Sequence, residues 1–143
     1  MTDTKMIVKS YLPEYEQAVI ELWRKCNLLR PWNNAKSDIE RKLKVNPELF
    51  LVGFFYDRIV ATAVGGYEGH RGWINYLAVD PVYQEKGLGK QIVETIERKI
   101  RALGCPKINI QLRIDNQDAI NFYESIGYNV DKVISMGKRL EDD

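Results

Sequence analysis

The sequence predicts a mixed α/β fold, between the α+β and α/β classes, in which about four helices flank a central mixed, mostly antiparallel sheet. Three observations lead to this prediction. The 143 residues suffice for one well-buried core but not for two, so residues 1–143 are expected to form a single domain. Short β-branched or aromatic runs around a tight turn predict antiparallel hairpins. A strand, a long amphipathic helix and a further strand then predict one parallel pair.

The first 48 residues predict a strand and two helices. Residues 5–11 alternate between apolar and polar side chains, as a half-buried strand does. Pro13 suits the first turn of a helix, where its missing N–H is not needed. That helix is indicated by apolar residues at spacings of three and four, namely Tyr15, Val19, Leu22, Trp23 and Cys26. After a loop, Ser37 and Glu40 have capping-box spacing, which predicts a second helix to about Val45.

The middle of the chain predicts three strands. Residues 49–55 and 59–65 lie on either side of Tyr56-Asp57-Arg58 and are typical of a hairpin. Residues 73–79 form the next expected strand. It should end at Asp80-Pro81, because proline cannot donate to a ladder.

The rest of the chain predicts a crossover unit and a shorter helix. A helix over residues 87–103 is indicated by a period of 3.6 residues in Leu88, Ile92, Val93, Ile96, Ile100 and Leu103. Gly104 is suited to end it. Residues 107–113 should then form a strand parallel to residues 73–79. A helix over 116–126 and one or two strands over 128–140 complete the expected fold.

Composition excludes several function classes. Lys and Arg total 21 against 20 acidic residues, a net charge of only +1, so no nucleic-acid partner is expected. No apolar run approaches the ~20 residues of a spanning helix, so no membrane partner is expected. The first residues contain no secretory h-region, which favours a cytoplasmic location. Cys26 and Cys105 have no metal-binding spacing, and we predict no metal site.

Residues 84–90, Gln-Glu-Lys-Gly-Leu-Gly-Lys, predict an anion site. They join a strand end to the start of the long helix, where the first N–H groups lack helical partners and the macrodipole is positive. Gly87 and Gly89 allow close approach of a phosphate, and Lys86 and Lys90 add positive charge. The alternative is a strand-to-helix turn that uses glycine for geometry alone. The spacing matches neither the dinucleotide fingerprint nor the Walker loop.

Two motifs in this context resemble those of the GNAT N-acetyltransferases. The first is Leu77-Ala78-Val79-Asp80-Pro81 followed by Tyr83-Gln84-x-x-Gly87-x-Gly89, similar to the family's Gln/Arg-x-x-Gly-x-Gly/Ala signature. The second runs from Asn116 through Ala119, Phe122, Tyr123 and Glu124 to Gly127-Tyr128. The resemblance implies that the parallel strands splay apart and that the pantetheine arm of acetyl-CoA, the cosubstrate, fills the gap. It implies a cofactor site of Leu77, Ala78, Val79, Gln84, Glu85, Lys86, Gly87, Leu88, Gly89, Lys90 and Asn116.

The resemblance also implies roles for two side chains of the second motif. Tyr123 corresponds to the family tyrosine that protonates the departing thiolate, since a phenol with a pKa of about 10 is close to a thiol with a pKa of about 8.5. The alternative is a packed aromatic ring. Asn116 would reach the cofactor, or it would serve only as a helix N-cap.

The sequence departs from the family pattern at the general base. The stretches 73–76 and 109–112 contain no carboxylate, and Gln111 can orient a water but cannot take a proton. Glu68 and His70, in the turn before the expected strand 73–79, are the nearest ionisable candidates, and we assign Glu68 as catalytic. Deprotonating a lysine-like amine at pH 7 requires about 4.6 kcal/mol, against about 1.1 kcal/mol for an α-amine. The missing base therefore favours either a water relay or an acceptor of low pKa, namely an α-amine or another weakly basic amine.

The acceptor itself is expected to be a small-molecule or peptide amine. Its pocket would draw on residues near the first two helices and the strands, with Leu29, Arg30, Trp32, Tyr67 and Tyr76 as candidates. A non-catalytic acyl-CoA-binding regulatory module is the alternative function. The similarity to enzymes that acetylate protein N-termini is weakened by Gln111. The oligomeric state stays open, with a homodimer among the options.

Overall fold

The computed structural model of the chain describes residues 5–84 and 86–143. Contacts between residues divide it into two compact units. The first unit runs up to Asn109 and also includes Asp143, and the second is Ile110–Asp142. Among the described residues, no helix has both the length and the apolar character that crossing a bilayer requires.

The first unit is built on a five-stranded sheet whose strands follow one another in chain order. Its strands are β1 (Ile7–Ser10), β2 (Phe50–Phe55), β3 (Arg58–Tyr67), β4 (Gly72–Val79) and β5 (Ile108–Asn109). The first four pair antiparallel, and β5 pairs parallel to β4. The predicted mixed, mostly antiparallel sheet with one parallel pair is therefore confirmed.

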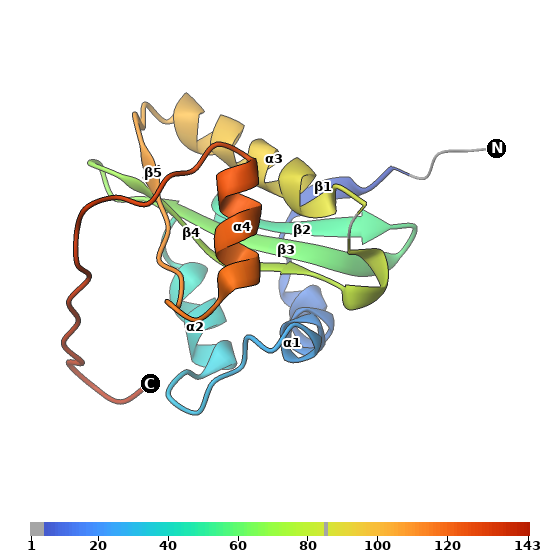
Figure 1. Cartoon of the computed structure of the whole chain (residues 1–143). Helices are drawn as coiled ribbons and strands as arrows, with labels where there is room; N and C mark the ends of the chain where they lie inside the picture. Colours follow the sequence, from blue (N-terminus) through green and yellow to red (C-terminus); the bar gives the residue numbers. More distant parts are fainter. Residues whose placement is uncertain (1–4, 85) are drawn as a thin grey trace. The chain divides into compact units, whose positions relative to one another are not determined.

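Helices cover both faces of this sheet (Figure 1). α1 (Glu16–Lys25) and α2 (Ala35–Lys42) lie on one face, and α3 (Leu88–Ala102) lies on the other. The apolar stripe of α1 buries Val19, Leu22 and Trp23 against residues of β2, β3 and β4. α3 approaches the sheet closely where β3 has Gly65, since a Cβ there would lie 2.4 Å from Ile96 Cδ1. The apolar faces that the sequence predicted for α1 and α3 thus pack against opposite faces of the sheet.

The start of the second helix differs from the prediction. α2 begins at Ala35, and its N-cap is Asn34, whose side chain accepts a hydrogen bond from the backbone N–H of Ser37 (3.1 Å). Ser37 is therefore inside the first turn rather than at the cap. Asparagine caps helices as well as serine does, so Asn34 serves as the N-cap three residues before the predicted Ser37.

The C-terminal strands also differ from the prediction. β5 contains only Ile108 and Asn109 of the expected strand 107–113, and the described residues 110–143 contain no strand. The second unit has one helix, α4 (Gln117–Ser125), with Asn116 as its N-cap, as expected. The apolar side chains beyond it are exposed, namely Val130, Val133, Ile134, Met136 and Leu140. Without a buried face, alternating residues do not define a strand register.

A β-bulge interrupts β4 at Tyr76. Thr62 pairs with Ala78, but Val64 pairs with Asn75, so Tyr76 and Leu77 together oppose one residue of β3. Tyr76 has a φ of 49°, a left-handed conformation that is uncommon for a bulky residue. Side chains normally alternate across a strand, and a bulge breaks that alternation. As a result, the consecutive residues Asn75 and Tyr76 line the same cleft.

Candidate functional site

The first part of the site is the edge of β4 that faces away from β3. β5 pairs only with Gly72 and Trp73, so residues 74–79 have no strand partner on that side within the described part of the first unit. Val79 pairs with Ala61, and next to this pair the N–H of Asp80 donates to the carbonyl of Val60 (2.8 Å). In such a ladder the N–H and C=O of Val79 point away from β3. We call residues 74–79 the open edge of β4.

The open edge leads directly into the predicted anion site. Asp80 is buried, and its Oδ1 accepts from the N–H of Val82 (3.0 Å), which sets the turn after the strand. The side chain of Gln84 then donates to the carbonyl of Val79 (3.1 Å). Strand end and loop are thus held together by side-chain hydrogen bonds. Glu85, which was assigned to the cofactor site, lies outside the described residues.

Among the described residues, the N-cap position of α3 makes no side-chain hydrogen bond to the helix. Gly87 is the N-cap residue, with a φ of 78°, and a Cβ placed on it would meet nothing within 4 Å. The first turn contains no acidic residue, and Lys86 and Lys90 are exposed. Leu88 is buried and anchors the helix start in the core. The first N–H groups of a helix have no acceptor within it, so those of Leu88, Gly89 and Lys90, beside two lysines, suit a phosphate or diphosphate.

The second part of the site is a cleft of about 550 Å³ on the face covered by α1 and α2. Its aromatic wall is formed by Trp23 and Tyr76, whose rings stack with centroids 3.9 Å apart. Apolar residues that include Leu28, Ile39 and Val64 complete the wall. Five polar residues also line it: Asn33, Asp38, Arg41, Lys42 and Asn75.

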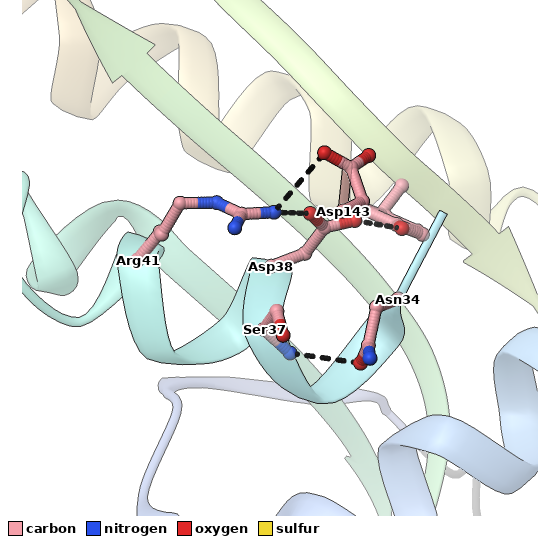
Figure 2. A network of polar contacts seen from close by, with 6 residues as sticks. Asn34, Ser37, Asp38, Arg41 and Asp143 are labelled. Carbon is pink, nitrogen blue, oxygen red and sulfur yellow. Dashed lines mark hydrogen bonds and ion pairs between the residues drawn. The ribbon is translucent and has the colours of Figure 1, made fainter. Parts of the chain in front are cut away.

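Asp38 is the centre of a polar network in this cleft. Its Oδ2 accepts a hydrogen bond from the hydroxyl of Tyr76 (2.5 Å), and its Oδ1 lies 2.6 Å from Nη2 of Arg41. Figure 2 shows Asp38 and Arg41 side by side on α2, with the carboxylate of Asp143 near the same guanidinium (4.0 Å). Burial, then the bond to Asp38, raises the pKa of Tyr76. Its hydroxyl therefore stays protonated and points at the carboxylate.

Lys42 brings a second cation into the cleft. Its Nζ donates to the carbonyl of Gly65 on β3, and the residue is only partly exposed. Burial lowers the pKa of Lys42, an effect that Glu48 opposes. Arg41 and Lys42 thus give the cleft positive charge on the side of α2.

Glu68 occupies a different environment from the cleft. Its carboxylate is exposed and accepts from the backbone N–H groups of Arg71 (2.5 Å) and His70, so it fastens the turn between β3 and β4. The bonds from Arg71 and then His70 lower the pKa of Glu68. Among the acceptor-site candidates from the sequence, Tyr76 lines the cleft. Leu29, Arg30, Trp32 and Tyr67 are not among its described lining residues.

The second unit contains the remaining predicted site residues. Oδ1 of Asn116 accepts from the N–H of Ala119 (3.1 Å) and caps α4. Tyr123 is buried, with its ring in edge contact with Phe122 and Tyr128. Burial raises the pKa of Tyr123, so its hydroxyl is protonated at neutral pH. The side chain of Gln111 donates to Oγ of Ser135 (2.5 Å).

Sequence reasoning missed Asp38, Arg41 and Lys42. The signal available for them was their spacing of three and four residues, which places them on one side of a helix. That spacing is equally typical of a solvated helix face, and nothing local distinguishes the two cases.

Comparisons with known proteins agree with this arrangement. The model of the acetyltransferase (GNAT) family matches residues 7–128. An acetyltransferase of Pectobacterium atrosepticum is 43% identical over 138 residues, which cover 96% of this chain and 98% of the relative. The chain therefore belongs to the GNAT acetyltransferase family. Acyl transfer from acyl-CoA to an amine is the general reaction of that family, and the chain is an acyltransferase of this kind.

Two solved structures show the same fold. The ribosomal-protein-S18-alanine N-acetyltransferase of Escherichia coli has a TM-score of 0.73 at 20% identity, over 87% of this chain and 78% of that one. The aminoglycoside enzyme AAC(6')-Iy, in complex with a bisubstrate analogue of CoA, has a TM-score of 0.77 at 15% identity, over 94% of this chain and 99% of that one.

Proposed function

We propose that the chain is an acetyl-CoA-dependent N-acetyltransferase that acetylates the α-amine of a small molecule or peptide by direct transfer. The observation that carries the proposal is the continuity of the open edge of β4 with the uncapped N-terminus of α3. An extended arm with amide groups and a diphosphate has the chemistry that these two features recognise.

The cofactor residues of the proposal divide by the groups they offer. Leu77 and the N–H of Val79 provide the strand edge for the pantetheine amides, and Ala78 lies between them with its own backbone groups toward β3. The carbonyl of Val79 already accepts from Gln84 and from Sγ of Cys26 (3.2 Å). The N–H groups of residues 87–90 and the side chains of Lys86 and Lys90 provide the diphosphate site. Gln84 steadies the loop through its bond to Val79, and Asn116 retains its amide N–H groups for a contact while its oxygen caps α4. When bound, acetyl-CoA supplies an activated thioester.

We assign the general base to Asp38 and replace Glu68 in this role. Asp38 lines the cleft and is joined to the hydroxyl of Tyr76, which stands one residue before the open-edge residue Leu77. The ammonium form of the acceptor loses its proton to Tyr76 Oη, while the Tyr76 proton passes to the Asp38 carboxylate. The neutral amine would then attack the acetyl carbon of bound acetyl-CoA, and the bond from that carbon to sulfur would break. Tyr123 would donate the proton that the departing sulfur takes up, and the second proton lost by the attacking nitrogen would pass through solvent to restore the Tyr123 hydroxyl.

The charges of the cleft support an α-amine as acceptor. Arg41 and Lys42 lie in the same cleft as Asp38. Nearby positive charges favour the neutral form of an amine and lower its pKa. An α-amine needs little further help, whereas a lysine side chain starts about 2.6 pKa units higher. The charges of the cleft therefore support an α-amine, which the sequence also favoured as the acceptor.

Calorimetry with acetyl-CoA, combined with thiol release in the presence of amine panels, tests this proposal. We expect micromolar binding of acetyl-CoA and turnover that is faster with α-amines than with lysine side chains at pH 7. Tyr123→Phe should lower kcat about 10- to 100-fold with little change in acetyl-CoA affinity. Binding without turnover across the whole panel would favour the acyl-CoA-binding regulatory module instead.

A further inference from the structure

In the cleft, the carboxylate of Asp38 and the guanidinium of Arg41 are in direct contact, and the distance between them limits which ligands can bind both. The carboxylate of Asp38 and the guanidinium of Arg41 lie 2.6 Å apart, on neighbouring turns of α2. A ligand that complements this pair must carry a positive and a negative group that are themselves close together. An α-amino carboxylate meets this requirement, because only one carbon atom separates its amine from its carboxylate.

Charged groups of both signs face the cleft on the side of α2. Arg41 and Lys42 are cationic, Asp38 lines the cleft as an anion, and the carboxylate of Asp143 lies beside Arg41. Nη2 of Arg41 donates one hydrogen bond to Asp38. A guanidinium has five N–H donors in a planar fork. Arg41 therefore retains donors for a second carboxylate.

A second carboxylate already lies beside Arg41 within the first unit. Oδ1 of Asp143, far away in the sequence, is 4.0 Å from Nη2 of Arg41 (Figure 2). Its negative charge also contributes to raising the pKa of Tyr76, so it lies near both ends of the Asp38 network. The space next to the guanidinium thus accommodates a carboxylate in addition to Asp38.

The remaining wall of the cleft indicates that the rest of the ligand is apolar. Leu28, Ile39, Phe50 and Val64 line it together with the stacked rings of Trp23 and Tyr76. The transfer of an apolar side chain from water to such a surface is favourable. A volume of about 550 Å³ is also within the range of small-ligand sites.

We propose that the acceptor is a free α-amino acid with an apolar side chain, held with its carboxylate on Arg41, its amine toward Tyr76 and Asp38, and its side chain against the aromatic wall. This inference rests on the proposed acetyl transfer and specifies its substrate class. The amine of a free amino acid is more basic than a peptide α-amine, because the neighbouring carboxylate stabilises its ammonium form, so its deprotonation depends on Tyr76 and Asp38. Lys42 strengthens the positive potential around the carboxylate. Arg41 acts as a specificity-determining residue, because a fork of parallel donors binds a carboxylate in two places.

Three ligands that share one side chain test the proposal on the full-length chain. Leucine, leucinamide and isoamylamine (leucine without its carboxylate) are compared by kcat/KM in thiol release from acetyl-CoA. We expect leucine to exceed both others by at least about tenfold, as loss of a charge-assisted contact implies. In Arg41→Gln, the preference for leucine over leucinamide, measured as the ratio of their kcat/KM values, should fall about tenfold or more, whatever the change that both share through the contact of Arg41 with Asp38.

Matched variants make the result specific. Arg41→Lys, which keeps the charge but loses the fork, should recover only part of the leucine preference. Lys44→Gln, an exposed residue beyond the end of α2, should leave that preference unchanged. Acetyl-CoA binding by calorimetry, unchanged in Arg41→Gln, shows that the variant is folded.

The two proposals fail in different ways. Turnover of leucinamide or isoamylamine at the rate of leucine would overturn the amino-acid assignment and leave acetyl transfer intact. The same holds if Arg41→Gln lowers activity equally on all three ligands. Absence of acetyl-CoA binding in the unaltered protein would overturn the proposed function and this inference together.

Discussion

Tyr76 shows how a single residue brings the two parts of the site together. Its left-handed backbone places its ring on the cleft side of β4, next to the open edge. The strained position is held by Thr62, whose hydroxyl donates to the carbonyl of Tyr76 (2.9 Å) and accepts from Nε1 of Trp23 (2.9 Å). Thr62 is fully buried, so both of these bonds are shielded from water. Strained residues with such support are typical of functional sites.

The choice between Asp38 and Glu68 as base can be made with two isosteric variants. Asp38→Asn should lower kcat about 100-fold or more, because it removes the proton acceptor and keeps the side chain's shape. Glu68→Gln should act mainly on the turn between β3 and β4, since its carboxylate serves two backbone N–H groups. Thiol-release kinetics and thermal unfolding of both variants provide the measurement.

The pH dependence of stability tests the structural role that we give to Glu68. Hydrogen bonds lower the pKa of Glu68 in the folded state. Its contribution to stability is therefore present above the pKa of the unfolded chain and is lost as the pH falls through the lowered value. Glu68→Gln should remove part of the acid-induced loss of stability. A large fall in kcat for Glu68→Gln, with Asp38→Asn active, would return the base to Glu68.

At the scale of elements, α3 is the part that the sequence described best. Its apolar period of 3.6, the glycine before it and Gly104 after it gave bounds close to Leu88–Ala102. Gly104 has a φ of 96°, as a residue that ends a helix often does. α2 was predicted with a shifted start, because Asn34 and Ser37 are equivalent capping residues by local chemistry. The prediction of strands after residue 109 was wrong, because the apolar residues there are exposed.

The N-terminus of α3 makes a prediction about cofactor binding. Lys86→Gln and Lys90→Gln should each weaken acetyl-CoA binding about three- to tenfold, and the loss should shrink at high salt because exposed charges are screened. Lys99→Gln, in the last turn of the same helix, is the matched control and should have no effect. Titration calorimetry at about 0.05 M and 0.5 M salt measures both quantities. Equal losses in all three variants would argue against a diphosphate at this helix end.

At the scale of the whole molecule, buried tyrosines link stability to alkaline pH. Burial raises the pKa values of Tyr11, Tyr76 and Tyr123 in the folded chain. For a raised pKa, the stabilising contribution is complete below the pKa of the unfolded chain, about 10, and is lost as the pH rises above it. The free energy of unfolding should therefore fall steeply above pH 10.

Tyr123 provides the sharpest test of this link, because it is 5% exposed. Tyr123→Phe should reduce the alkaline slope of the unfolding free energy by at most about 1.4 kcal/mol per pH unit. Tyr56→Phe, at a residue that is 85% exposed, is the control and should leave the slope unchanged. Urea unfolding between pH 8 and 11 gives the slopes. Identical slopes in Tyr123→Phe and the unaltered chain would show that the phenol ionises freely in the folded state.

The sequence by itself determined the layers of the first unit and the parallel pair, and it predicted where an anion would bind. These features depend on periodicities and on glycines within short segments, and local stereochemistry is enough to specify them. Only the tertiary structure decided the cleft beside α2 to which we assign the acceptor. Asp38 and Tyr76 are 38 residues apart and meet because a bulge turns Tyr76 toward α2. A bulge is set by packing and hydrogen bonds from other elements, here Trp23 and Thr62, so no short segment of sequence contains it.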